Sequence, residues 1–151
     1  MAIKVGDKAP NFTLKSQSGD TVSLGDFLGK KAVVVYFYPK DDTPGCTAES
    51  CAFRDSHQVF ADAGAEDIGI SGDSVDSHQA FASKHSLPFT LLSDEGDKVR
   101  KLYGVPPVLW LLPGRVTYVI DKDGTVRHIF DSMMEFDKHV SEAMTVVEGL
   151  S

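Results

Sequence analysis

Residues 36–51 have the sequence Tyr36-Phe-Tyr-Pro-Lys-Asp-Asp-Thr-Pro-Gly-Cys46-Thr-Ala-Glu-Ser-Cys51. They continue an apolar run that begins at Ala32 and is rich in β-branched and aromatic residues, which indicates a central strand covered on both faces. Pro39 ends this strand, a polar turn follows, and a helix is predicted to begin at Thr43-Pro44. Both cysteines of the chain therefore lie in the opening turns of one helix.

Cys46 is expected in the first turn of that helix. Thr43 suits the N-cap, Pro44 suits the first helical position, and Gly45 lets a ligand approach the backbone. Unpaired N–H groups and the positive end of the helix dipole favour a thiolate over a thiol at such a position. The sequence thus predicts a reactive thiolate at Cys46, with a small buried core cysteine as the alternative.

The spacing of the two cysteines adds a conformational requirement. In an intact helix the Cα atoms of Cys46 and Cys51 would lie roughly 8–9 Å apart, on different sides of the axis. A disulfide needs Cα atoms within about 7 Å. If the two cysteines pair, the first turns must therefore unwind, which predicts a helical reduced state and a locally unfolded oxidised state.

Metal binding is the other interpretation of a local cysteine pair. Structural zinc usually takes four ligands in closely spaced pairs, whereas this chain has two cysteines and five histidines without matched spacing. We therefore expect no metal and no cofactor, and we expect the histidines to be surface or half-buried residues. These histidines are His57, His78, His85, His128 and His139.

Composition indicates one globular domain over residues 1–151, since 42% of the residues are hydrophobic and 25% are charged. The net charge of -7 argues against nucleic acid or an anionic membrane as a partner. No apolar run approaches the roughly 20 residues of a membrane span. The N-terminus has neither a signal-peptide nor a transit-peptide pattern, although the chain can be the mature form of an imported protein.

The rest of the chain predicts alternating strands and helices. Strands are expected over residues 12–15, 21–24, 32–38, 67–71, 89–92, 116–120 and 126–130, and helices over 43–63, 73–85, 98–103 and 136–147, with a helical turn at 26–29. Helical spacing places Val59 and Phe60, and likewise Phe136 and Val140, on buried faces. The order predicts an α/β fold whose mixed central sheet is flanked by helices and carries an N-terminal β-hairpin.

In the stretch that carries the two cysteines, the chain resembles the peroxiredoxins, specifically the Q type, also called the bacterioferritin-comigratory-protein subfamily. The family motif Pro-x₃-Thr/Ser-x₂-Cys is matched by Pro39, Thr43 and Cys46, and Cys51 matches a resolving cysteine five residues later. Further matches are Phe53-Arg-Asp55, Gly69-Ile-Ser71, Leu87-Pro-Phe89, Leu92-Ser-Asp94 and Gly114-Arg115. The resemblance covers roughly residues 5–147, with weaker similarity at 106–112 and 131–136. It implies a thioredoxin-like fold and thiol-dependent peroxidase activity.

The resemblance also implies a role for each residue of the site. Cys46 is the peroxidatic nucleophile, whose thiolate attacks the O–O bond and becomes a sulfenic acid. Thr43 is expected to hydrogen-bond the thiolate and the peroxide, and Arg115 to stabilise the thiolate and the developing oxyanion. Pro39 is expected to pack over the site and limit water, and Glu49 to partner Arg115 or shape the site. The alternatives are a strand terminator at Pro39, a surface arginine at Arg115 and a solvated helix carboxylate at Glu49.

The remaining implications concern turnover and partners. Cys51 is expected to form an intramolecular disulfide with Cys46, which thioredoxin or a similar dithiol reduces. The substrates are then hydrogen peroxide and organic hydroperoxides, the protein is a monomer, and it works in a reducing compartment, which is the chloroplast for a mature plant protein and otherwise the cytoplasm. A disulfide oxidoreductase or redox sensor is one rival interpretation, and a non-enzymatic binding or chaperone-like module of the same fold is another.

Overall fold

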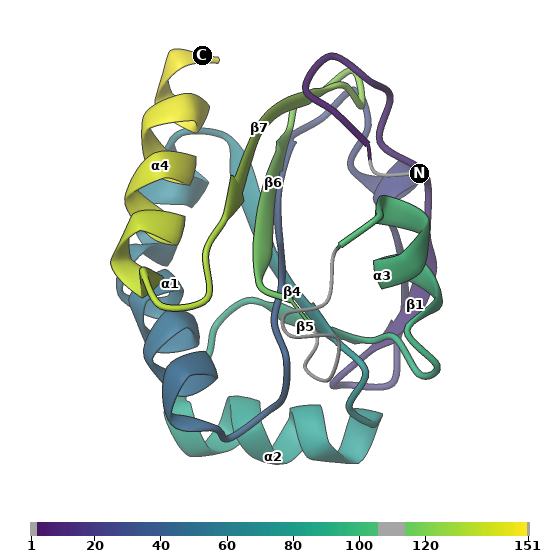
Figure 1. Ribbon diagram of the computed structural model, residues 1–151, viewed down its shortest axis with the longest axis vertical. Helices are drawn as coiled ribbons and strands as arrows, with labels where there is room; N and C mark the ends of the chain where they lie inside the picture. The colour runs from purple at the N-terminus through teal and green to yellow at the C-terminus, as the bar shows by residue number, and fades with distance from the viewer. Residues whose placement is uncertain (1–2, 106–113, 151) are drawn as a thin grey trace.

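The computed structural model describes residues 3–105 and 114–150, and within them seven strands form one mixed sheet in the order β2-β1-β5-β4-β3-β6-β7 (Figure 1). Its strands are β1 (Thr13–Ser16), β2 (Thr21–Ser23), β3 (Ala32–Phe37), β4 (Ala65–Ser71), β5 (Thr90–Ser93), β6 (Val116–Ile120) and β7 (Val126–Asp131). Strands β3, β4 and β5 are parallel, while β1 and β6 run antiparallel to their central neighbours. The predicted N-terminal hairpin is β1–β2, and the predicted final hairpin is β6–β7.

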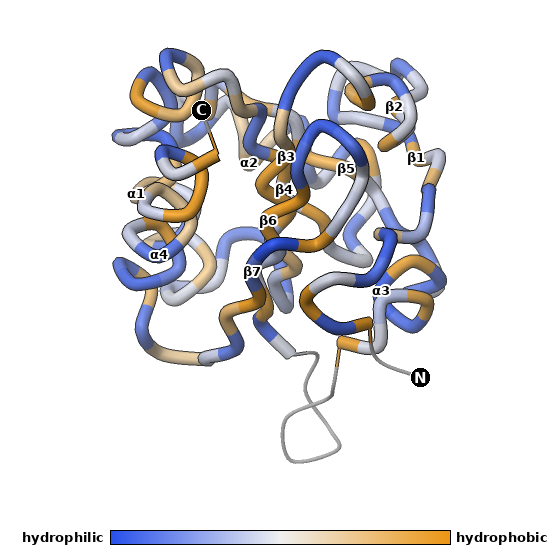
Figure 2. The backbone as a smooth tube through the Cα atoms, turned by 90° about the horizontal axis from the view of Figure 1, so that it is seen from above, coloured by the Kyte–Doolittle hydropathy of each residue, from blue (hydrophilic) through white to orange (hydrophobic). Residues whose placement is uncertain are grey.

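Helices cover both faces of the sheet. They are α1 (Pro44–Asp62), α2 (Val75–His85), α3 (Lys98–Tyr103) and α4 (Phe136–Gly149), with a short 3₁₀ helix η1 (Leu24–Asp26). Figure 1 shows α1 and α4 together on one side of the sheet and α3 on the other, and in Figure 2 the hydrophobic central strands run between these layers. The predicted mixed α/β architecture is confirmed, and no helix among the described residues is long and apolar enough to cross a membrane.

Strand β3 supplies both halves of the core. Every residue of β3 is buried, and because successive side chains of a strand point to opposite faces, the run contributes to two layers at once. The ring of Tyr36 stacks on Phe53 of α1 with centroids 4.3 Å apart. The next residue, Phe37, faces Tyr103 of α3 with centroids 5.4 Å apart. This explains why the sequence of β3 is continuously apolar rather than alternating.

A buried polar network fixes the loop between β3 and α1. The Tyr38 hydroxyl donates to Asp41 Oδ1 at 2.6 Å, and the Ser77 hydroxyl at the start of α2 donates to Asp41 Oδ2 at 2.8 Å. The ring nitrogen Nδ1 of His78 lies 2.7 Å from the same carboxylate. The network ties the loop to α2, and it thereby sets where α1 begins.

The expectation of surface or half-buried histidines is wrong for two of the five, because His78 and His139 are fully buried. Each ring has a hydrogen-bond partner on both nitrogens, which makes full burial of a polar ring tolerable. Besides Asp41, His78 contacts the Leu92 carbonyl at 2.9 Å through Nε2. His139 contacts Thr117 Oγ1 and the Ser132 carbonyl, each at 2.7 Å.

Two other burial predictions need correction. Val59 is 42% exposed, whereas Phe60 is fully buried; neighbouring positions of a helix point about 100° apart, so Phe60 fills the core and Val59 faces outward. Phe136 is only half-buried, and its ring lies against the candidate site instead of the sheet. The weaker similarity noted for residues 106–112 lies outside the described residues.

Candidate active site

Cys46 lies in the first turn of α1, as predicted. Thr43 is the N-cap with extended backbone angles, Pro44 is the first helical residue, and Cys46 is 1% exposed. The Thr43 side chain makes no capping hydrogen bond; its hydroxyl donates to the Lys40 carbonyl at 2.9 Å. The hydroxyl expected to contact the thiolate therefore has the Lys40 carbonyl as its partner in this structure.

Arg115 occupies the space beside the sulfur. Nη2 of Arg115 donates to Cys46 Sγ at 3.3 Å, Nη1 donates to Glu49 Oε1 at 2.5 Å, and Nε donates to the Met133 carbonyl at 3.1 Å. Arg115 is 3% exposed and Glu49 is fully buried. The alternative interpretations, a surface arginine at Arg115 and a solvated helix carboxylate at Glu49, are therefore wrong. The guanidinium is held on three sides, which fixes the direction in which it faces the sulfur.

The guanidinium of Arg115 is thus shared by the Glu49 carboxylate and the Cys46 sulfur. Burial raises the pKa of Glu49 to about 7, and the charge and hydrogen bond of Arg115 oppose this effect. Burial lowers the pKa of Arg115, but the charges of Glu49 and Cys46 outweigh burial and leave it raised. The second carboxylate oxygen of Glu49 has no hydrogen-bond partner among the described residues, and it lies 3.5 Å from Nδ1 of His139.

The lack of a side chain at Gly45 has a packing reason. A Cβ atom there would lie 2.9 Å from Cζ of Phe136 and 3.2 Å from Nη2 of Arg115. The same phenyl ring has its centroid 4.9 Å from Cζ of Arg115, a cation–π contact. Gly45 therefore lets the N-terminus of α4 close over the arginine.

The two remaining predicted site residues are Pro39 and Cys51. Pro39 follows the last residues of β3 and is half-buried. Cys51 is also half-buried and lies further along the intact helix α1, and both cysteines are free thiols. The structure thus has the helical arrangement in which the spacing argument forbids a Cys46–Cys51 disulfide.

Sequence reasoning missed Arg100, Phe136 and His139 as residues near the site. Arg100 is 5% exposed and donates to the carbonyls of Tyr38 and Gly114. A helical pattern signal existed for two of them. Arg100 stands three residues before the buried Tyr103, and His139 stands four residues before Ala143, so both lie on the buried face of their helix.

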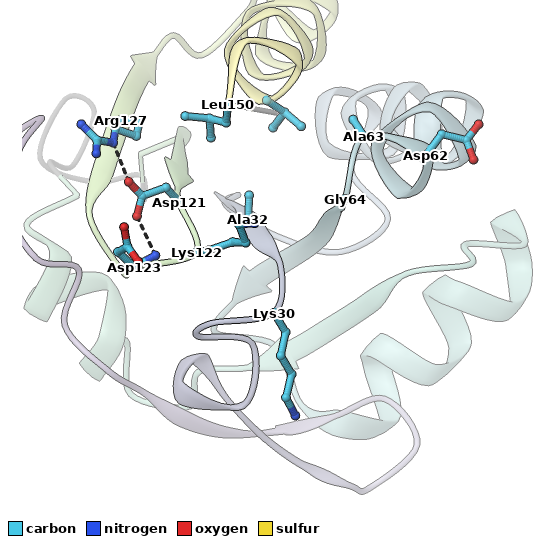
Figure 3. Close-up of a pocket in the computed structure, with 11 residues that line it drawn as sticks. Lys30, Ala32, Asp62, Ala63, Gly64, Asp121, Lys122, Asp123, Arg127 and Leu150 are labelled. Atoms are coloured by element: carbon cyan, nitrogen blue, oxygen red, sulfur yellow. Dashed lines mark hydrogen bonds and ion pairs between the residues drawn. The ribbon is translucent and has the colours of Figure 1, made fainter.

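The described residues also form an open hollow at the opposite end of β3, which Figure 3 shows. It is lined by the start of β3, the end of β6 and the last turn of α4, including Ala32, Asp121 and Leu150. Its Arg127 pairs with Asp121, and neither cysteine borders it. Because neither cysteine lines the hollow, it is not the candidate active site.

Within residues 3–105 and 114–150, one group of side chains is close enough to hold a cation. Ligand atoms of Asp41, Asp73 and His78 lie within 4.8 Å of one another. However, Asp73 Oδ2 already accepts hydrogen bonds from the Ser71 hydroxyl at 2.6 Å and from the Asp41 amide at 2.8 Å. These contacts stabilise the loop before α1, and they account for the close approach of the three side chains without a cation.

Comparisons with known proteins show the family of the chain. Residues 5–129 match the AhpC/TSA family. Peroxiredoxin Q, chloroplastic, of Triticum aestivum is 56% identical over 149 residues, which span 98% of this chain and 68% of that protein. Peroxiredoxin Q, chloroplastic, of Sedum lineare is 57% identical over 146 residues, which span 96% of this chain and 78% of the relative.

Solved structures share the fold. Peroxidoxin BcpB from Mycobacterium tuberculosis superposes with a TM-score of 0.91 at 36% identity and covers 99% of both chains. Peroxiredoxin Q from Xanthomonas campestris has a TM-score of 0.85 at 28% identity, over 91% of this chain and 90% of that one.

Proposed function

Because the chain belongs to the AhpC/TSA family and is a peroxiredoxin, a thiol-dependent peroxidase with a thioredoxin-like fold, we propose that Cys46 is its peroxidatic nucleophile. The observation that carries the proposal is the Arg115 guanidinium, which donates to Cys46 Sγ at 3.3 Å while Glu49 and the Met133 carbonyl hold it in place. A fixed, buried cation beside a sulfur at a helix N-terminus favours the thiolate, and the thiolate is the reactive form.

The first step is attack of this thiolate on the terminal oxygen of a hydroperoxide. An S–O bond forms as the O–O bond breaks, Cys46 becomes a sulfenic acid, and the departing oxygen leaves as water or an alcohol after it takes up a proton. Arg115 and the backbone N–H groups of the first turn stabilise the charge that develops on that oxygen. The Thr43 hydroxyl turns from the Lys40 carbonyl toward the bound peroxide, and Pro39 limits water at the mouth of the site.

The second step joins Cys46 to Cys51. The Cys51 thiolate attacks the sulfenic sulfur, an S–S bond forms, and hydroxide leaves and is protonated to water. Since the intact helix keeps the two sulfurs apart, the first turns of α1 unwind before this step. A dithiol reductant of the thioredoxin type then reduces the disulfide and restores the thiols.

This catalytic cycle also bears on the oligomeric state and the compartment of the protein. A resolving cysteine in the same helix requires no second subunit, so the proposed enzyme works as a monomer. Its disulfide needs a compartment that supplies dithiols. The curated plant relatives are named chloroplastic, which supports the chloroplast for a mature plant protein, with the cytoplasm as the alternative for another source.

Serine variants of each cysteine test the cycle. With a thioredoxin system and hydrogen peroxide, Cys46→Ser should consume no peroxide above the uncatalysed rate. Cys51→Ser should oxidise Cys46 once at the wild-type rate, measured by mass spectrometry after rapid quenching, and then fail to turn over. Full peroxide consumption by Cys46→Ser would show that the nucleophile lies elsewhere.

A further inference from the structure

Arg100 approaches the candidate site from the other layer of the molecule. It belongs to α3, on the face of the sheet opposite α1 and α4 (Figure 1), and its guanidinium lies over Phe37, whose ring centroid is 5.8 Å from Cζ. At the end of β3 its guanidinium donates from Nη2 to the Tyr38 carbonyl and from Nη1 to the Gly114 carbonyl, each at 2.6 Å. Arg100 is 5% exposed, so these bonds are shielded from water.

The two carbonyls belong to chain segments that carry site residues. Tyr38 precedes Pro39, and Gly114 precedes Arg115. The antiparallel pairing of β3 with β6 ends at Phe37 and Val116, and Pro39 has no N–H with which to continue it. Beyond this pairing, one planar guanidinium donates both to the residue after β3 and to a residue before β6, and it thereby links the two segments.

Among the described residues, no carboxylate oxygen lies within hydrogen-bond distance of the Arg100 guanidinium. Its nearest carboxylate oxygen is Oδ1 of the half-exposed Asp97, 3.9 Å from Nε. The two carboxylate oxygens of the buried Asp94 accept hydrogen bonds from the backbone N–H groups of Val99 and Arg100, at 3.0 Å and 2.9 Å. Burial lowers the pKa of Arg100, and the charges of Asp97, Asp94 and Cys46 oppose this effect. Arg115, by contrast, already has Glu49 as its partner.

We propose that Arg100 is a positioning residue of the peroxidase site, which holds the segments of Pro39 and Arg115 at the separation that aims Arg115 at Cys46 Sγ. Its buried charge adds a second cation that interacts with Cys46 through space. This inference rests on the assignment of Cys46 as the peroxidatic nucleophile. Arg100 acts through the backbone and touches no reacting atom.

Two substitutions separate its geometry from its charge. Arg100→Met removes both, whereas Arg100→Lys keeps the charge but cannot donate along a planar fork to two carbonyls. Arg127→Met is the matched control, since Arg127 is a half-exposed arginine paired with Asp121 at the far end of the sheet. For each variant, quenched-flow mass spectrometry gives the rate constant for oxidation of Cys46 by hydrogen peroxide, and iodoacetamide alkylation at pH 7 reports the thiolate without peroxide.

Arg100→Met should slow peroxide oxidation about 100-fold, the size of effect expected when a catalytic group moves by about 1 Å, and it should also slow alkylation. Arg100→Lys should lose about 10-fold in peroxide oxidation and clearly less in alkylation, because its retained charge still favours the thiolate while Arg115 is misaligned toward the peroxide. The Arg127→Met control should match wild type in both assays. If Arg100→Met does not fold, Arg100→Lys alone decides the matter.

A wild-type peroxide rate in a folded Arg100→Lys or Arg100→Met variant would overturn the proposal. Equal losses of alkylation and peroxide oxidation in Arg100→Lys would also overturn it, since they would mean that geometry toward the peroxide is not what Arg100 supplies. Failure of the underlying assignment has a different signature, namely peroxide consumption that survives in Cys46→Ser with Arg100 intact.

Discussion

Each of the three guanidinium nitrogens of Arg115 donates to a different partner. These partners are the Cys46 sulfur, the Glu49 carboxylate and a backbone carbonyl. A lysine ammonium at this position could not reach three partners spread around a plane. The phenyl ring of Phe136 closes the fourth side. The direction of the cation is therefore set by neighbours from α1 and α4, and small volume changes among these neighbours should be felt at the sulfur.

Gly45→Ala tests this at a single atom. Alanine would normally stabilise a helix by about 1 kcal/mol over glycine, but the added Cβ would meet Phe136 at 2.9 Å and Arg115 at 3.2 Å. Overpacking of this kind costs about 1–3 kcal/mol, so we expect a lower free energy of unfolding and slower oxidation of Cys46. Urea unfolding and quenched-flow mass spectrometry measure the two effects.

The control for Gly45→Ala is the same change made in a Phe136→Ala background. Removal of the ring removes the shorter contact, so the loss of stability should shrink or reverse in that background. An equal loss in both backgrounds would show that Phe136 is not what excludes a side chain at position 45.

Helix α1 combines two requirements along its length. Its first two turns carry Cys46, Glu49 and Cys51, and its later turns place Phe53 and Phe60 in the core against β3. The first turns must be ordered while Cys46 waits for peroxide and must come apart for the disulfide. The later turns can stay folded, because the aromatic residues hold them to the sheet independently of the N-terminus.

Oxidation should therefore divide α1. After one equivalent of peroxide, amide hydrogen exchange should increase over residues 44–51 and stay slow over residues 53–62. Cys51→Ser, which cannot form the disulfide, should show no such increase after the same treatment. Unchanged protection of residues 44–51 in a disulfide-bonded sample would contradict the unwinding.

The elements themselves were largely predictable from the sequence. Helix α3 and strand β6 lie where the pattern placed them, since periodicity reflects which side each residue buries. The positions of Cys46 and Glu49 followed from helix-start signals in the same stretch. Arg100 and Phe136 were not predictable as site residues, because their roles depend on distant segments meeting in space. The role of Arg100 follows from its hydrogen bonds to the carbonyls of Tyr38 and Gly114, which only the folded structure brings together.

At the scale of the whole molecule, buried acids make stability depend on pH. Asp67 of β4 is fully buried, contacts His57 Nδ1 at 2.8 Å through one oxygen and has no partner for the other among the described residues. Burial raises the pKa of Asp67 to about 6, an effect that the hydrogen bond of His57 opposes. The folded state therefore holds the Asp67 proton more tightly than the unfolded chain does.

The sign follows from linkage. With a folded pKa of about 6 in place of the ordinary 3.8, the protonated Asp67 contributes stability that is fully present below the ordinary value and is lost as pH rises to about 6. Asp67→Asn has no such proton, so its free energy of unfolding relative to wild type should increase across this window. Urea unfolding at pH 4, 5 and 6 measures the difference.

Asp55→Asn, at an exposed site on α1, is the control for Asp67→Asn, and it should run nearly parallel to wild type over the same pH range. Glu49 and His139 titrate in all three proteins, so their effects cancel in the comparison. A constant difference between Asp67→Asn and wild type at every pH would mean that Asp67 has the same pKa in the folded and unfolded chain.

The partners of the sulfur come from distant parts of the chain, and this has a consequence for folding order. Arg115 is 69 residues from Cys46 and 66 residues from Glu49, and Arg100 is 62 residues from Tyr38. Contacts of such large sequence separation form late, because the entropy of closing long loops must be overcome first. A newly made chain in which β6 has not yet paired with β3 would carry Cys46 without Arg115 beside it. Reactivity toward peroxide then appears only once β6 has joined the sheet, so the thiol of a newly made chain is protected from oxidation until Arg115 is in place.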